Sequence, residues 1–291
     1  MWCSHLAAPH FVEGIMNKSM LCKIIKDGMS DQEKLDTIGI TFINGRISEI
    51  KNYQFDKRHG IQELDNFSSS HNENGDRKNF RILPGSQNRL ESIVTEFLEI
   101  HKLQIDPTIL INLCKSEVVK EGKRARLTLL GVQRKNSKER ILKSYFSLRK
   151  FNSTRDIIGK WQGYMDLQDV LGNLCLPSSF CCFLEKVSKI LEPDGYYPSL
   201  LGMNQSNTEI EYKVYYELFN PDLFFEHIKG HTEEVLRNIS SHLHCVADEF
   251  IESNFCCIEA GLFLRGIAVS DKTMKCGSVI RLYFAPINRF I

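Results

Sequence analysis

Residues 211–219 read EYKVYYELF and alternate strictly between two kinds of side chain. The first set is Tyr212, Val214, Tyr216 and Leu218, and the second set is Glu211, Lys213, Tyr215 and Glu217. Because successive side chains of a strand point to opposite faces, the run predicts a β-strand with one face suited to a core. The other face carries acids, a cation and a phenol, so it either meets water or lines a site.

The same plan of two β-rich runs around a polar turn occurs four times. The four regions are residues 34–55, 126–148, 196–219 and 262–286. In the first region the turn is Asn44-Gly45, a pair typical of two-residue hairpin loops. The sequence therefore predicts four antiparallel hairpins.

Segments with helical spacing of apolar residues lie between these hairpins. They are residues 89–103, 165–175, 180–191 and 222–253, the last with Asp222 as a candidate start. Residues 56–88 are polar and rich in turn formers, which predicts a long mobile loop. Hairpins that alternate with helices favour an α/β fold, either an open sheet covered on one face or a closed antiparallel barrel ringed by helices. We expect residues 1–291 to form a single domain.

Each predicted hairpin carries, in its second strand, a cation two residues before a tyrosine. The four pairs are Lys51/Tyr53, Lys143/Tyr145, Lys213/Tyr215 and Arg281/Tyr283. With 9 tyrosines and 37 lysines plus arginines in 291 residues, about one such pair is expected by chance. In the last three strands the opposite face is largely apolar, so the cations and tyrosines should converge on the face away from the helices.

Lysines and arginines gathered at one depth repel each other unless they bind an anion, and a diphosphate fits this requirement. Tyrosine rings can stabilise a carbocation and keep water from it. Together these groups suit ionisation of an allylic diphosphate and alkylation of an acceptor, with a nearby acid taking the proton. Two alternatives stay open: an open sheet whose polar face is simply solvated, and a non-catalytic sheet that binds RNA or a phosphorylated ligand.

The overall composition narrows the partners. A formal net charge of +1 argues against nucleic acid, and the sequence has neither an 18-residue apolar run nor a secretory signal pattern. The ten cysteines include two adjacent pairs and no Cys-x-x-Cys, so we expect reduced core residues in a cytoplasmic protein.

Several metal and nucleotide motifs are missing. The sequence contains no Asp-Asp-x-x-Asp, no P-loop and no dinucleotide fingerprint. His242 and His244 fall in a predicted helix at a spacing that does not bring both rings to one ion. We therefore expect no protein-held metal and no organic cofactor, with cations and phenols holding the diphosphate and one Mg²⁺ bridging it to solvent.

The repeated strands, with ILKSYF at 141–146 and YKVYY at 212–216, resemble those of the ABBA-type prenyltransferases. The stretches QIDPTILINLCKSEV, starting at 104, and CCIEAGLFLRGIAVSDKT, starting at 256, look closest to the cyanobactin-type peptide prenyltransferases. The resemblance implies a barrel of repeated α-β-β-α units that moves a dimethylallyl group from its diphosphate to a side chain of a macrocyclic or linear peptide. Prenylation of a small aromatic metabolite is the alternative within the same fold.

The expected site combines both lines of reasoning. The diphosphate would be bound by Lys143, Lys213 and Arg281, and the prenyl group would be shielded by Tyr145, Tyr215 and Tyr283. The resemblance adds an acid in the first strand and an arginine in the second, which match Asp36 and Arg46. Simple alternation would point Asp36 towards the helices, so Glu33 is a second candidate base. Arg46 and Lys51 have opposite parity, so both reach the same face only if a bulge intervenes.

Glu211 and Glu217 add negative charge to the predicted polar face. Glu211 stands where fungal relatives carry arginine, which is a departure from the family pattern. We expect Glu211, like Asp36 or Glu33, to orient or deprotonate the acceptor and Glu217 to help bind it, and together Glu211 and Glu217 should favour a cationic acceptor, such as a guanidinium.

Overall fold

The structure is a computed structural model. It describes residues 21–23, 25–26, 35–43, 46–54, 77–82, 89–115, 126–134, 139–150, 163–164, 178–218, 232–242, 248–270 and 279–286. The predicted helix at 165–175 and the predicted helix start at Asp222 lie outside the described residues.

Nine strands of the described part form one antiparallel sheet in the order β2-β1-β11-β10-β9-β8-β5-β4-β3. These strands are β1 (Leu35–Ile43), β2 (Arg46–Gln54), β3 (Arg77–Arg81), β4 (Arg126–Arg134), β5 (Arg140–Ser147), β8 (Tyr196–Gln205), β9 (Ile210–Leu218), β10 (Leu262–Ser270) and β11 (Val279–Pro286). A small second sheet pairs β6 (Arg149–Lys150) with β7 (Gly163–Tyr164).

The four predicted hairpins are confirmed as β1–β2, β4–β5, β8–β9 and β10–β11. Ile43 pairs with Arg46, which leaves a two-residue connection, as the Asn-Gly pair predicts. The prediction of a loop throughout 56–88 is wrong in one place, because Arg77–Arg81 forms β3 and pairs with β4. The rest of that segment, apart from Ile82, lies outside the described residues.

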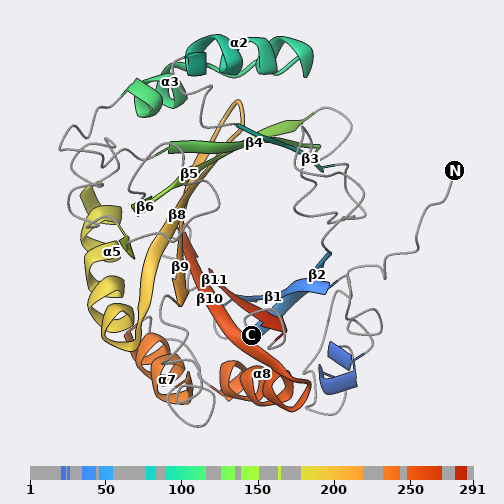
Figure 1. The fold of residues 1–291 in the computed structure, drawn as a ribbon, viewed down its shortest axis with the longest axis vertical. Coiled ribbons are helices and arrows are strands. Elements are labelled where there is room, and N and C mark those ends of the chain that lie inside the picture. The colour runs from blue at the N-terminus through green and yellow to red at the C-terminus, as the bar shows by residue number, and fades with distance from the viewer. Residues whose placement is uncertain are drawn as a thin grey trace, which may run out of the picture.

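The large sheet curves so that its helices lie outside it, as Figure 1 shows. These helices are α2 (Leu90–Ile100), α3 (Thr108–Lys115), α5 (Ser178–Leu191), α7 (Thr232–His242) and α8 (Asp248–Glu259), with a 3₁₀ turn, η2 (Glu192–Asp194), after α5. The predicted helix over 222–253 is thus two helices in the described part. Strands β2 and β3 are the sheet edges, and no pairing between them occurs among the described residues, so closure of the predicted barrel stays a prediction.

Alternation gives the sheet an apolar face towards the helices and a polar inner face. On β9, the side chains of Tyr212, Val214 and Tyr216 are buried, and Tyr216 is 0% exposed. The Tyr216 hydroxyl lies 3.1 Å from Ser188 Oγ and donates to the Leu184 carbonyl oxygen at 3.3 Å, and both partners belong to α5. Burial raises the pKa of Tyr216, so this phenol stays protonated. The helix-facing side chains of β9 therefore pack the sheet against its helices.

The inner face is defined here by six side chains from β5, β9 and β11. They are Lys143, Tyr145, Lys213, Tyr215, Arg281 and Tyr283, and each is partly exposed. Their outward neighbours on the same strands, such as Phe146, Val214 and Leu282, are at most 1% exposed. The sequence prediction that cations and tyrosines share one face of the sheet thus agrees with the strand geometry.

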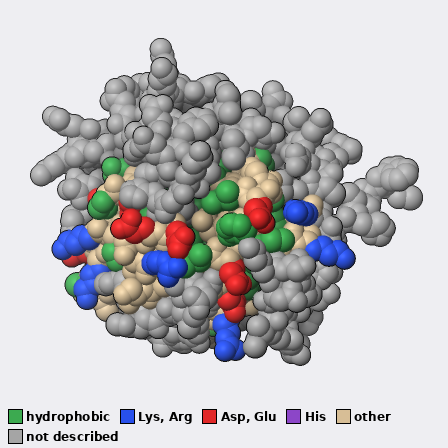
Figure 2. Space-filling model, turned by 90° about the horizontal axis from the view of Figure 1, so that it is seen from below, with side chains coloured by type: hydrophobic (Ala, Val, Ile, Leu, Met, Phe, Trp, Pro, Cys, Tyr) green, Lys and Arg blue, Asp and Glu red, His purple; other side chains and the backbone are tan. Residues whose placement is uncertain are grey.

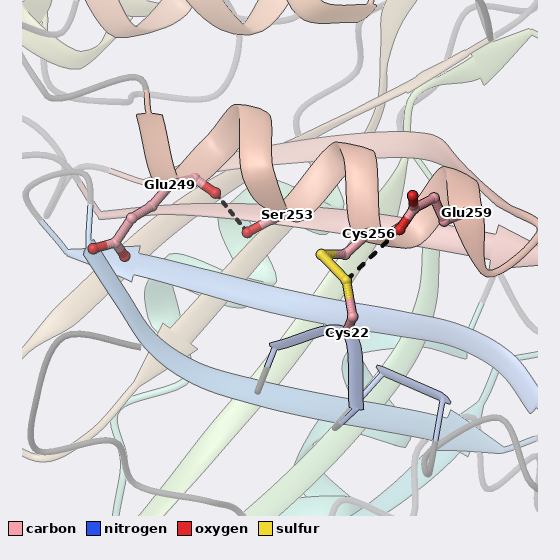
Figure 3. The surroundings of a disulfide bond; sticks show 5 residues. All are labelled: Cys22, Glu249, Ser253, Cys256 and Glu259. Atoms are coloured by element: carbon pink, nitrogen blue, oxygen red, sulfur yellow. Dashed lines mark hydrogen bonds between the residues drawn. A yellow bond between two sulfur atoms is a disulfide. The ribbon is translucent and has the colours of Figure 1, made fainter. Parts of the chain in front are cut away.

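A disulfide joins Cys22 to Cys256 across 234 residues of chain, which differs from the expectation that the cysteines are reduced. Cys22 lies in a helical segment near the N-terminus and Cys256 lies in α8, so the bond ties that segment to the outside of the sheet (Figure 3). Among the described cysteines, Cys181, Cys182 and Cys257 are not part of a disulfide. None of the described helices is both long and apolar enough to cross a membrane.

Candidate active site

The three inner tyrosines lie close together although they come from non-adjacent strands. The ring centroids of Tyr145 and Tyr215 are 6.2 Å apart, and those of Tyr215 and Tyr283 are 5.8 Å apart. Strands β8 and β10 run between them, so these strands must carry small residues at the same level. Gly202 of β8 fills this need, because a Cβ there would lie 3.2 Å from the Tyr215 ring and 3.3 Å from the Tyr145 ring.

Glycines recur opposite the inner-face side chains. Gly131 pairs with Lys143, Gly202 with Tyr145 and Lys213, Gly39 with Tyr283, and Gly266 with Tyr283 and Glu217. Each of these glycines belongs to the first strand of its hairpin, whereas the long polar side chains belong to the second strand. This pattern is visible in the sequence, because the first strand of every hairpin contains one glycine among apolar or long residues. Our sequence analysis did not use it.

Lys213 lies in a compact polar cluster with Glu211 and Asn204. Its Nζ is 3.2 Å from Glu211 Oε2, and Asn204 Nδ2 donates to the same oxygen at 2.8 Å. Burial lowers the pKa of Lys213 from its usual value, while Glu211 opposes this effect and the positive charge of Arg281 adds to it. The effect of Arg281 on the pKa of Lys213 is electrostatic repulsion between the two cations. A bound anion would offset this repulsion.

Arg281 forms a second cluster at the neighbouring hairpin. Its Nε donates to Thr41 Oγ1 at 2.7 Å, and its Nη2 lies 3.5 Å from Glu49 Oε2. Both charged side chains are largely buried, with 23% and 20% of their surface exposed. Glu49 is a candidate functional residue that the sequence analysis missed.

A β-bulge lies next to Glu49 in β2. Thr41 pairs with Glu49 and Phe42 pairs with Ile47, so Ser48 is an extra residue in β2. Because of this extra residue, positions 46, 49 and 51 of β2 all pair with inner-face positions of β1. Arg46 pairs with Ile43, Glu49 with Thr41 and Lys51 with Gly39. The bulge that the sequence analysis required for Arg46 and Lys51 is therefore present. Arg46 itself is exposed, at the start of the strand.

The structure describes the backbone of Asp36, the predicted acid of the first strand, but not its side chain. Asp36 belongs to β1, where Leu35 pairs with Gln54 and Thr37 with Tyr53, so an extra residue is present at this position too. Simple alternation, which would have turned Asp36 towards the helices, does not apply across this irregularity. The side chain of Asp36 and the whole of Glu33 lie outside the described residues, so their roles stay predictions.

The two acids of β9 both have protein cations beside them, and the expectation of a cationic acceptor stays a prediction. Glu211 pairs with Lys213, and Glu217 Oε1 lies 3.3 Å from Arg265 Nη2 of β10. A guanidinium acceptor would have to compete with these protein cations. Arg265 is an extra residue in the first strand of its hairpin, so the cation–tyrosine spacing of the second strands does not reveal it.

The described residues contain no group of three or more His, Cys, Asp or Glu side chains arranged for a metal ion. Mg²⁺ prefers oxygen ligands, and the inner-face carboxylates of Glu49 and Glu211 are each within ion-pair distance of a protein cation. These residues do not fit a metal held by the protein, so no step below depends on Mg²⁺. A Mg²⁺ that bridges the diphosphate to solvent stays a prediction.

The surface of the described part gives no sign of a nucleic-acid site on the face seen in Figure 2. Lysine and arginine side chains there are interspersed with aspartate and glutamate and do not gather in one basic patch. A nucleic-acid site relies on clustered positive charge. The expectation that the protein has no nucleic-acid partner stays a prediction.

Comparisons with known proteins identify the fold. No family model matches the chain, and no curated protein sequence matches it. Solved structures do match: a 6-dimethylallyl tryptophan synthase has a TM-score of 0.54 at 10% identity and covers 89% of this chain and 83% of its own. AnaPT from Neosartorya fischeri has a TM-score of 0.55 at 11% identity, with 88% and 79% covered.

A third match is the 6-dimethylallyltryptophan synthase from Micromonospora olivasterospora in complex with DMASPP and Trp. Its TM-score is 0.52 at 10% identity, with 89% of this chain and 83% of that chain covered. At this level of identity the likeness concerns the fold, which is that of the ABBA prenyltransferases. The cyanobactin-type subfamily has no support from these matches.

Proposed function

We propose that this protein transfers a dimethylallyl group from dimethylallyl diphosphate to an aromatic ring of a small acceptor. The observation that carries the proposal is the convergence of three cation–tyrosine pairs on the inner face of the sheet, with tyrosine rings 5.8 and 6.2 Å apart. The solved structures with the same fold include dimethylallyl tryptophan synthases, one of them in complex with DMASPP and Trp, which supports this donor and an aromatic acceptor.

The diphosphate is assigned to the cationic side of the inner face. Lys143, Lys213 and Arg281 would bind its oxygens, and Arg46 at the strand end would add a fourth positive charge. Burial is the main cause of the lowered pKa of Lys213, and the charge of Arg281 adds to it; an anion bound here would offset the repulsion between these two cations. When the C–O bond of the donor breaks, these cations stabilise the charge that develops on the leaving diphosphate.

The prenyl group is assigned to the tyrosine cluster. Tyr145, Tyr215 and Tyr283 present ring faces that attract a positively charged allylic group and exclude water from it. A ring carbon of the acceptor forms the new C–C bond as the diphosphate leaves with the electrons of the C–O bond. The ring then loses a proton to a carboxylate, which restores aromaticity.

Four carboxylates are candidates for the base. Asp36 and Glu33 follow from the family resemblance, and Glu211 lies within the Lys213 cluster. Among side chains that the structure describes, Glu49 fits best, since it lies beside Arg281 at the level of the tyrosines and is 20% exposed.

The test is incubation of the protein with dimethylallyl diphosphate and a panel of tryptophan, tyrosine, simple phenols and aromatic-containing linear and cyclic peptides, followed by mass spectrometry. We expect a product enlarged by C5H8 with a small aromatic acceptor and slower transfer to peptides. Product on peptides alone would instead support the peptide acceptor that the cyanobactin resemblance implies. Binding of RNA or a phosphorylated ligand without product would support the non-catalytic alternative and refute the proposal.

A further inference from the structure

We propose that Glu249 of α8 is a positioning residue, which holds Glu49 and Arg281 of the inner face in the arrangement that binds the diphosphate. This inference rests on the proposed prenyl transfer and adds a residue that acts on the donor site from outside the sheet. Glu249 Oε2 accepts a hydrogen bond from the backbone N–H of Ile47 at 2.6 Å. Figure 3 shows this side chain extending from α8 to the strands of the first hairpin.

The hydrogen bond from Glu249 ends at the bulge of β2. The bulge lies between Ile47 and Glu49, where Ser48 is the extra residue. Ser48 Oγ donates to the Thr41 carbonyl oxygen at 3.2 Å, which ties the extra residue to β1. Two side-chain hydrogen bonds therefore hold the bulge, one from within the hairpin and one from a charged group of the helix layer. Hydrogen bonds to a charged group are the stronger kind.

The position of the bulge decides which face of the sheet Glu49 occupies. Phe42 pairs with Ile47. If this register continued without an extra residue, Glu49 would pair with Ile40, which is 0% exposed on the face towards the helices. A slip of one residue moves a strand side chain from one face to the other. An anchor on the Ile47 N–H opposes this slip and keeps Glu49 on the inner face.

Thr41 connects the bulge to the donor site. It pairs with Glu49 of β2 on one side and with Arg281 of β11 on the other. Its carbonyl oxygen accepts from Ser48, and its hydroxyl accepts from Arg281 Nε at 2.7 Å. Glu49 Oε2 lies 3.5 Å from Arg281 Nη2. A change in the bulge would therefore alter two contacts of the Arg281 guanidinium, to which the diphosphate is assigned.

Glu249 acts through the backbone of β2 and does not touch the donor. Helix α8 lies outside the sheet, whereas the diphosphate is assigned to the inner face (Figure 1). Charge alone would have the opposite effect on donor binding, because a carboxylate repels a diphosphate and its removal would tighten binding. A positioning role instead predicts weaker binding when Glu249 loses its hydrogen-bond acceptor.

The experiment is calorimetric titration of the protein with DMASPP, using the wild type, Glu249→Gln and Glu249→Met. Both variants lose the negative charge, but glutamine keeps a side-chain oxygen that can accept from the Ile47 N–H. Glu249→Gln should stay within about twofold of the wild-type Kd. Glu249→Met should raise the Kd about 3- to 10-fold, as expected for the loss of one hydrogen bond that orients a binding residue.

Two controls separate positioning from general effects on the fold and on charge. Tyr216→Phe removes the phenol that contacts α5, so it should lower the melting temperature without changing the Kd. Arg237→Gln removes a charge from the outer surface of α7, where the ion pair with Glu233 is 57% and 49% exposed, and it should also leave the Kd unchanged.

A double variant tests whether Glu249 acts through Arg281. Adding Glu249→Met to Arg281→Gln should raise the Kd by less than about twofold over Arg281→Gln alone, because the residue that the bulge orients is already missing. If Glu249→Met does not fold, Glu249→Asp takes its place. Its carboxylate is one CH₂ group farther from Ile47, so the Kd should rise about threefold.

An unchanged or lower Kd for Glu249→Met, or for Glu249→Asp in its place, would overturn the inference and leave prenyl transfer standing. The same holds if Glu249→Gln weakens binding as much as Glu249→Met, if the effects in the double variant are additive, or if Tyr216→Phe raises the Kd equally. If the folded wild type does not bind DMASPP, the proposed function itself is wrong and the inference falls with it.

Discussion

Two adjacent tyrosines of β9 provide a direct test of the two faces of the sheet. Tyr216 points to the helices and Tyr215 lies on the inner face, so the same substitution by phenylalanine should have opposite consequences. Tyr216 is 0% exposed, and its hydroxyl lies 3.1 Å from Ser188 Oγ and 3.3 Å from the Leu184 carbonyl oxygen. Tyr216→Phe removes this hydroxyl and leaves a ring of nearly the same shape.

The size of the effect follows from these contacts. A buried hydrogen bond contributes about 0.5–1.5 kcal/mol net, and the variant leaves the Ser188 hydroxyl with one partner fewer. We expect Tyr216→Phe to lower the free energy of unfolding by about 1–2 kcal/mol and the melting temperature by a few degrees. Tyr215→Phe should change stability by less than about 0.5 kcal/mol, because that side chain is only partly buried.

The assay is urea unfolding of both variants together with prenyl-transfer kinetics. Tyr216→Phe should keep kcat close to wild type, whereas Tyr215→Phe should raise the donor KM several-fold through loss of a phenol near the diphosphate. The reasoning fails if Tyr215→Phe is the more destabilised protein, or if Tyr216→Phe loses transfer while remaining folded.

Further predictions concern the inner face and the disulfide. Because burial lowers the pKa of Lys213, donor binding should weaken with rising pH earlier than for an ordinary lysine, and Lys213→Arg should flatten this profile in a titration of donor Kd. Lys213 loses its proton at lower pH in the folded protein than in the unfolded chain, so its contribution to the free energy of unfolding increases as pH rises towards 10.5. A Lys213→Met variant whose free energy of unfolding changes with pH in the same way as the wild type would contradict this. Gly202→Ala should push the tyrosine rings apart and raise donor hydrolysis relative to transfer several-fold, measured as pyrophosphate released per product; an unchanged ratio would show that ring spacing is unimportant. Reducing the Cys22–Cys256 bond should lower the free energy of unfolding by about 2–4 kcal/mol in denaturant titrations, because it closes a long loop, and equal curves with and without reductant would show that the bond is absent.

The hairpins could be predicted from sequence because each has an alternating strand with one apolar face. Strand β3, RKNFR, could not be, since it offers one apolar side chain and four polar ones. It is a strand because its backbone pairs with β4, and such pairing is set by tertiary context rather than by composition.

Only part of the candidate site could be predicted from the sequence. The cation–tyrosine pairs follow from a two-residue spacing that survives along a regular strand. Arg265 could not be placed, because it is itself an extra residue that changes the register of β10 locally. The contact of Glu49 with Arg281 depends on the pairing of β1 with β11, which the sequence pattern does not specify. The pairing of Glu211 and Glu217 with cations also depends on contacts with neighbouring residues and strands that the sequence pattern does not specify.

The central claim is that the inner face binds an allylic diphosphate through its cations. The most direct measurement is calorimetric titration of the protein with the donor analogue DMASPP, using the wild type, Arg281→Gln and the surface control Arg237→Gln. We predict saturable binding to the wild type and the control, with affinity at least about tenfold lower for Arg281→Gln. Failure of the folded wild type to bind DMASPP, or equal binding by Arg281→Gln, would contradict the account.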